Sequence, residues 1–113
     1  MAVDIKSLYK GQLGSSEGNL YGPASGKAAL VKSIRLVNTG GSPVTVNLFV
    51  KRGSGSSYRV IPKDLSLAAG AAFIDNDEVA LEYVDGSNID YLRGVASAAT
   101  TVDCVISGIE KTL

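Results

Sequence analysis

The sequence contains no histidine and no tryptophan, and it has a single cysteine among 113 residues. A hydrolase triad needs a base to activate its nucleophile, so the lack of histidine excludes the common Ser-His and Cys-His forms. Zinc sites of the usual kind combine several Cys and His ligands, which one cysteine cannot supply. We therefore expect a protein that is not an enzyme and has no catalytic, cofactor-binding or metal-ligating residues.

A surplus of either charge is also lacking. The chain has eleven basic and eleven acidic residues, so its formal net charge is zero. Nucleic acid or an anionic membrane would not be attracted to such a chain over distance. The longest basic cluster is the pair Lys51-Arg52. We therefore expect neither nucleic acid nor membrane among the partners.

The single cysteine, Cys104, excludes an intrachain disulfide. It alternates with Val102 and Ile106 as strand residues do, which predicts a small buried hydrophobe, with an intermolecular disulfide as the alternative. No apolar run approaches the length of a membrane-spanning helix or a signal peptide. We expect a protein that is made in the cytoplasm and kept reduced there.

The segment from residue 28 to residue 51 has the pattern of a β-hairpin. Two runs rich in Val, Ile, Leu and Thr flank the turn-forming cluster 38–43. In the second run a strict period of two predicts a core face made of Val44, Val46, Leu48 and Val50. The first run is apolar on both faces, with Leu30, Ile34 and Leu36 on one and Val31 and Val37 on the other. This pattern predicts a first strand that is covered on both sides.

Further short strand patterns follow at residues 58–61, 65–67, 71–74, 78–83, 89–96 and 101–109. The last two are expected to pair around a turn at 97–100. Seven or eight short strands with a turn signal every eight to twelve residues are typical of antiparallel sandwiches and barrels. We predict an all-β fold, an antiparallel β-sandwich of jelly-roll or related Greek-key type, with a closed barrel as the alternative.

Residues 1–26 differ in composition from the rest of the chain. Glycines and serines interrupt any regular element there, while a few larger side chains could anchor the segment: Tyr9, Leu13, Leu20 and Tyr21. Such a segment is either an arm that orders against a neighbour or a mobile tail. We expect an extended N-terminal arm at residues 1–26 and a β-sandwich domain at residues 27–113.

Five polar segments are candidates for a metal-, phosphate- or nucleic-acid-binding site. The acidic run Asp75–Glu78 could suggest calcium, but it lacks EF-hand spacing and is expected to be a solvated turn, as is Asp85–Asn88. The glycine-serine loop 53–57 is not followed by the Lys-Ser/Thr of a phosphate-binding loop. Tyr58-Arg59 and the segment 91–93 could stack on single-stranded nucleic acid, although ordinary strand positions are the favoured interpretation.

Three segments together carry a family resemblance: PASGKAALVKSIRLVN at 23–38, LSLAAG at 65–70 and VISGIE at 105–110. They resemble the patterns P-A-G-K-T-A-x-V-x-x-I-x-L-x-N, L-A-A-G-E and V-x-x-S-G-x-E of small β-sandwich virion proteins of tailed bacteriophages. The resemblance covers residues 21–111. It departs at 85–89, where this chain has D-G-S-N-I in place of the G-D-x-I of that group.

The resemblance implies a structural part of a virion. The first expectation is a capsid decoration (cement) protein that binds and stabilises the head shell as a homo-oligomer, with the major capsid protein or other virion proteins as partners. The alternative within the virion is a subunit of the tail or neck. A further alternative is a small carbohydrate- or host-surface-binding module, which would place Tyr58, Tyr83 and Tyr91 on one shared face.

Overall fold

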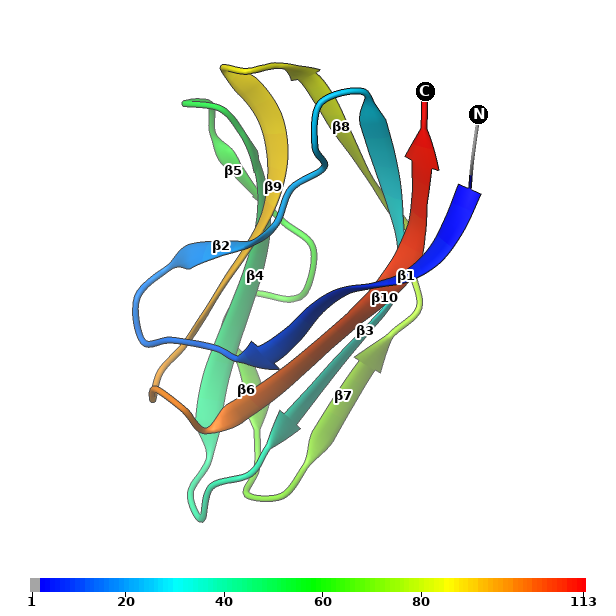
Figure 1. Ribbon diagram of the computed structural model, residues 1–113. Helices are drawn as coiled ribbons and strands as arrows, with labels where there is room; N and C mark the ends of the chain where they lie inside the picture. Colours follow the sequence, from blue (N-terminus) through cyan, green and yellow to red (C-terminus); the bar gives the residue numbers. More distant parts are fainter. Residues whose placement is uncertain (1–2) are drawn as a thin grey trace.

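The computed structural model describes residues 3–113, which form ten β-strands (Figure 1). Every strand pairing is antiparallel. None of these residues belongs to a helix, so this part of the chain has no helix that could cross a bilayer. The all-β prediction is thereby confirmed. The strands are β1 (Val3–Gln12), β2 (Gly18–Tyr21), β3 (Lys27–Asn38), β4 (Val44–Arg52), β5 (Ser57–Arg59), β6 (Leu65–Leu67), β7 (Ala72–Asp75), β8 (Val79–Asp85), β9 (Asn88–Ala96) and β10 (Val102–Thr112).

The strands form one continuous sheet with the order β1-β10-β3-β8-β9-β4-β5, in which β7 also borders β3, β6 borders β4 and β2 borders β9. The pairing of β8 with β9 is the only link between two halves of the described sheet. We call β1, β10, β3, β7 and β8 the first half, and β2, β9, β4, β5 and β6 the second half. Figure 1 shows the β8–β9 turn at the top of the view, with β3 and β10 of the first half on one side and β4 and β9 of the second half on the other.

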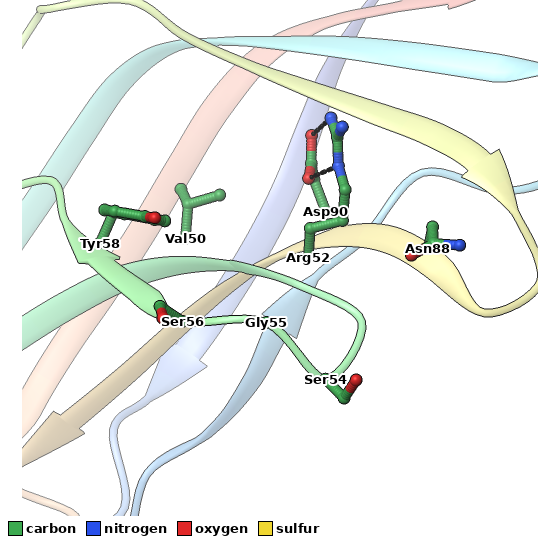
Figure 2. Close-up of a pocket in the computed structure, with 8 residues that line it drawn as sticks. All are labelled: Val50, Arg52, Ser54, Gly55, Ser56, Tyr58, Asn88 and Asp90. Atoms are coloured by element: carbon green, nitrogen blue, oxygen red, sulfur yellow. Dashed lines mark hydrogen bonds and ion pairs between the residues drawn. The ribbon is translucent and has the colours of Figure 1, made fainter.

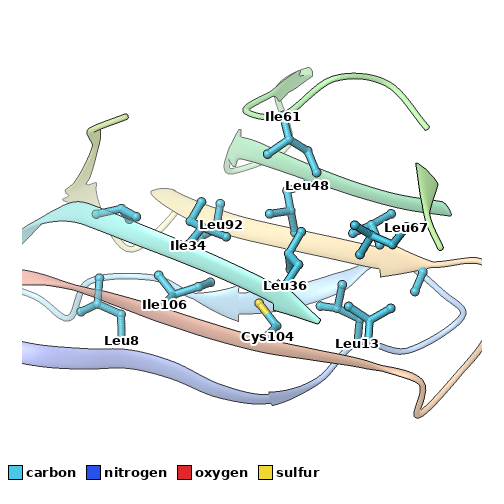
Figure 3. Packing of buried hydrophobic residues seen from close by; sticks show 14 of the residues in the cluster. Leu8, Leu13, Ile34, Leu36, Leu48, Ile61, Leu67, Leu92, Cys104 and Ile106 are labelled. Atoms are coloured by element: carbon cyan, nitrogen blue, oxygen red, sulfur yellow. The ribbon is translucent and has the colours of Figure 1, made fainter. Parts of the chain in front are cut away.

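The core lies between the two halves, and Figure 3 shows side chains of both meeting there. Along β4 the alternation of apolar residues buries Val44, Val46 and Leu48, as the sequence predicted, whereas Val50 is only half-buried against the core. Strand β10 shows the same period. Most of the fully buried apolar side chains come from β3, β10 and β8 in the first half and from β4 and β9 in the second: Val31, Ile34, Leu36, Val102, Cys104, Ile106, Leu81, Val46, Leu48 and Leu92.

The predicted hairpin between residues 28 and 51 is wrong, although both of its strands exist. β3 pairs with β10, β7 and β8, whereas β4 pairs with β9, β5 and β6. Residues 39–43 do not form a tight hairpin turn but carry the chain from the first half to the second. The predicted pairing of residues 89–96 with 101–109 is wrong for the same reason, because β9 and β10 also lie in different halves. Periodicity reports which face of a strand is buried, but not which strand lies beside it.

A β-bulge explains why β3 is apolar on both of its predicted faces. Ser33 pairs with Ser107 and Val31 pairs with Gly108, so Lys32 is an extra residue in β3. The bulge places both Val31 and Ile34 in the core, although their spacing is odd. It therefore corrects the predicted division of β3 into two apolar faces. Glycine is needed opposite the bulge, since a Cβ at residue 108 would lie 2.2 Å from the Leu30 carbonyl oxygen.

The segment before residue 27 forms two strands of the sheet. β1 pairs along its length with β10, and β2 pairs with β9. Leu13, in the connection between them, is 1% exposed and belongs to the core. Its backbone nitrogen donates to the Val102 carbonyl, while the Gly14 carbonyl accepts from Ala96. This connection therefore crosses from the first half of the sheet to the second and hydrogen-bonds to both.

Candidate functional site

One pocket is an open depression of about 560 Å³ at the end of the β4–β5 hairpin (Figure 2). Its wall is built from the end of β4, the loop to β5 and the start of β9. The lining residues are Val50, Arg52, Ser54, Gly55, Ser56, Tyr58, Asn88 and Asp90. Gly53 has a φ of 53°, and the loop can turn there because glycine tolerates the left-handed region.

Arg52 and Asp90 form a two-pronged ion pair inside this pocket, drawn as dashed lines in Figure 2. Arg52 donates from Nε to Asp90 Oδ1 at 2.7 Å and from Nη2 to Oδ2 at 2.9 Å. The Glu82 backbone nitrogen also donates to Asp90 Oδ2. The hydrogen bonds from Arg52 lower the pKa of Asp90 and raise that of the guanidinium. The pair ties β4 and β9 to β8 at the link between the two halves.

The charges of this pocket are already matched within the chain. Arg52 is its only lining cation, and Glu82 is a second carboxylate partner at 3.1 Å. The other polar lining groups are neutral hydroxyls and the amide of Asn88. No residue lining the pocket is a lysine or histidine that could take a proton from a serine hydroxyl. The pocket can therefore hydrogen-bond a neutral polar ligand, but it presents no unpaired charge that would bind an ionic ligand.

A second polar cluster surrounds Glu110, which is 5% exposed at the end of β10. Lys6 Nζ donates to Glu110 Oε1 at 2.9 Å, Lys27 Nζ to the same oxygen at 3.3 Å, and Tyr21 Oη to Oε2 at 2.6 Å. These hydrogen bonds, Tyr21 first, lower the pKa of Glu110 to about 2. Partial burial and this contact raise the pKa of Tyr21. The cluster thus joins β1, β2 and β3 to β10 through one carboxylate.

The prediction that Cys104 is a small buried hydrophobe is confirmed, since its side chain is fully buried in the core. Burial raises the pKa of its thiol to about 12. The thiolate is the reactive form of cysteine, so this thiol is protonated at neutral pH and shielded from reagents.

Both acidic turns have the hydrogen bonds of the predicted Asx turns. Asp75 Oδ1 accepts from the backbone nitrogen of Asp77, and Asp85 Oδ1 accepts from that of Ser87, each at 2.9 Å. Asp85 also accepts from the Asn88 amide. Among residues 3–113, no three Cys, Asp or Glu side chains converge on a point where a metal ion could bind.

The tyrosine-arginine segments lie on β5 and β9, which border β4 from opposite sides, and they do not form one face. Tyr58 pairs with Val50 and Tyr91 with Lys51, so the two rings point to opposite faces of the sheet. The expectation that Tyr58, Tyr83 and Tyr91 share a face is therefore wrong. Arg59 lies 4.8 Å above the Phe49 ring. Arg93, paired with Phe49 from the other side, donates to Glu17 at 2.8 Å.

One further spacing in the sequence is Ser7-x-x-Lys10, which some acyl-transfer enzymes use. Both residues are exposed on β1, at the edge of the sheet. A serine nucleophile and its base work in a site that excludes water, which an exposed edge strand does not provide. Ser7 and Lys10 therefore form no reactive pair.

Motif searching missed the buried polar residues Asn38, Asp90 and Glu110. The signal that could have found two of them is the period of two. Glu110 continues the inward positions of Cys104 and Ile106, and Asp90 precedes Leu92 with the same parity. A charged residue at an inward position needs a partner, which would have directed attention to it.

Comparison of the chain with family models, with curated proteins and with solved structures found no match.

Proposed function

We propose that this protein is a non-enzymatic structural component of a tailed-bacteriophage virion, and that it decorates and stabilises the capsid shell as a homo-oligomer. The observation that carries the proposal is the resemblance of residues 23–38, 65–70 and 105–110 to small β-sandwich virion proteins. The finer fold type belongs to the same proposal: two sheet halves around one core, arranged as a jelly-roll or related Greek-key sandwich.

The contacts among the three motif segments support this proposal. β3, which holds most of the first motif, pairs along its length with β10, which holds the third. Asn38, the last residue of the first motif, donates through its side chain to the Leu67 and Ala68 carbonyls of the second. Its own carbonyl accepts from Gly70. The motifs thus meet in one structural unit, as expected if they encode a shared fold rather than chance turn patterns.

The satisfied polar groups and the exposed apolar side chains of this domain suit a structural protein that binds a shell and catalyses no reaction. No buried side-chain polar atom in residues 3–113 lacks a hydrogen-bond partner. The charged groups around Asp90 and Glu110 pair with one another and join neighbouring strands. Large apolar side chains are exposed on β1, β7 and β8, among them Ile5, Ile74 and Val84. Such side chains can be buried on repeated positions of a lattice.

Immunogold labelling of purified particles tests the proposal. Antibody raised against the folded protein should label heads at many positions, because a decoration protein repeats over the shell. Label confined to tails or necks would favour the alternative virion location. Particles that carry no label, from a lysate in which the protein is abundant, would contradict a virion role. A module binding carbohydrate or a host surface is less well supported, because Tyr58 and Tyr91 face opposite ways.

A further inference from the structure

β1 is an edge strand whose second side is open. Within residues 3–113 its only strand partner is β10, and it stands at the end of the sheet order (Figure 1). The outer edge of such a strand presents unpaired N–H and C=O groups, to which another strand can add. The bulge at Leu8 divides β1, since Ser7 pairs with Ser107 but Tyr9 pairs with Ile106. The bulge thus separates residues 3–7 from residues 9–12, and residues 3–7 are the longer regular stretch of the open edge.

This part of the edge carries the most exposed large apolar side chain among residues 3–113. Ile5 is 95% exposed and Val3 is 59% exposed. Through the strand register Ile5 lies beside Ile109, which lies beside Leu30, which lies beside Ala80. A shallow apolar groove of about 260 Å³ passes along this surface between Val3, Leu30 and Ile109. These four cross-strand neighbours form an apolar row across β1, β10, β3 and β8. The row ends at Ile5, on the strand whose outer edge is open.

We propose that residues 3–7 of β1 pair with the same residues of a second copy of this chain, antiparallel about a two-fold axis at Ile5. A two-fold axis perpendicular to the sheet pairs residues of equal parity, because directly opposite side chains point to the same face. Ile5 then faces Ile5 of the second copy, Asp4 faces Lys6, and Val3 faces Ser7.

The charges of β1 select this register over its neighbours. A two-fold axis at Asp4 would set two aspartates opposite each other, and an axis at Lys6 would set two lysines opposite each other. Like charges directly opposite destabilise an antiparallel pair, whereas opposite charges stabilise it. The axis at Ile5 gives two Asp4–Lys6 pairs and no like-charge pair within residues 3–7. The charges on this edge therefore favour pairing with a second copy in this register and disfavour the neighbouring registers.

The pairing would also join the two apolar rows. Ile5 of one copy would lie beside Ile5 of the other, so that the row of each copy continues into the other. The result would be one apolar stripe across eight strands, made of Ala80, Leu30, Ile109 and Ile5 from each copy. Ile5 loses its exposure in this arrangement, which supplies a hydrophobic contribution beside the backbone hydrogen bonds. Five residues on each copy form a small interface, so we expect a dimer that dissociates on dilution.

Sedimentation velocity over a wide range of protein concentration tests the pairing. The wild-type chain should pass from monomer to dimer as concentration rises. Ile5→Lys should raise the dissociation constant at least about tenfold, because it sets two lysines against each other at the axis. Ile74→Lys is the matched control: Ile74 is also exposed, on β7 at the far side of the first half, and its replacement should leave the dimer intact. A wild-type monomer at every concentration, or an Ile5→Lys dimer, would overturn the proposal.

Cysteine crosslinking tests the register itself. Under mild oxidation the Ile5→Cys variant should form a disulfide between position 5 of one chain and position 5 of a second chain. Directly opposite Cα atoms in antiparallel strands lie within disulfide range. Val3→Cys and Ser7→Cys should not crosslink singly but should crosslink when the two variants are mixed. Cys104 is buried and adds no background. Crosslinking in any other combination would contradict the two-fold axis at Ile5.

This inference does not rest on the virion role, since it concerns the purified chain alone. A dimer that fails to bind phage heads would support the pairing and contradict the decoration proposal. A chain that stays monomeric and binds heads would contradict the pairing and the homo-oligomeric part of the decoration proposal, but would support binding to the shell.

Discussion

Three buried polar side chains, Asn38, Asp90 and Glu110, each hold together segments that are far apart in the sequence. Glu110 joins β10 to β1, β2 and β3, and Asp90 joins β9 to β4 and β8. A buried charge without partners is strongly unfavourable, so each of these clusters stabilises only the one arrangement in which all partners are present. At the scale of single residues, the polar core thus contributes specificity as well as stability.

Glu110 should make the stability depend on acidity in a defined window. Its folded pKa of about 2 lies below its ordinary value of 4.5, so its contribution is complete above pH 4.5 and is lost as pH falls toward 2. Glu110→Gln should lower the free energy of unfolding by about 2 kcal/mol at pH 7. Urea denaturation at several pH values measures this. The difference from wild type should shrink between pH 4.5 and 2, and a difference that stays constant would contradict the assignment.

Asn38 should be among the most sensitive positions in the chain. Its Nδ2 donates to the Ser42 carbonyl at 2.8 Å and to those of Leu67 and Ala68, and its Oδ1 accepts from Gly40. Asn38→Ala removes these four hydrogen bonds, of which the one to Leu67 is buried and the others are part-buried, so we expect a loss of about 2–4 kcal/mol in unfolding free energy. Asn47→Ala, at an exposed network with Asp64, is a control that should cost much less. Equal losses would refute the special role of Asn38.

At the scale of elements, the sequence predicted strands well and strand partners poorly. The alternation in β4 and the turn signals located most strands to within a few residues. The partner of each strand depends on contacts between distant residues, such as those of Asn38 with Leu67 and Ala68, which no local pattern records. The bulge at Lys32 was hidden as well, because one extra residue reverses the parity on which face assignments depend.

Leu13 tests whether the segment before residue 27 is part of the folding unit. It is 1% exposed in the core, between β1 and β2. Leu13→Ala should lower the free energy of unfolding by about 3 kcal/mol, through lost burial and the cavity left behind. Ile74→Ala, at a side chain that is 49% exposed, is the aliphatic control and should cost under about 1 kcal/mol. If Leu13→Ala had no effect, the segment would be an appendage that folds separately from the core.

At the scale of the whole molecule, the two halves of the sheet enclose one core, because β8 pairs with β3 in the first half and with β9 in the second. The all-β class followed from the short strands and frequent turns. The pocket beside Arg52 and the cluster around Glu110 did not follow, because each is assembled from strands whose pairing the sequence leaves open. The open edge at β1 likewise emerges only when the order of the strands is known.

The most direct measurement of the virion role is a binding titration of the purified protein on phage heads that lack it. Heads are separated from free protein by sedimentation, and the bound copies are counted against the major capsid protein. A decoration protein occupies repeated lattice positions, so binding should saturate at a fixed ratio and should raise the temperature at which the heads rupture. Binding that does not saturate, or heads that are neither occupied nor stabilised, would contradict the proposed function.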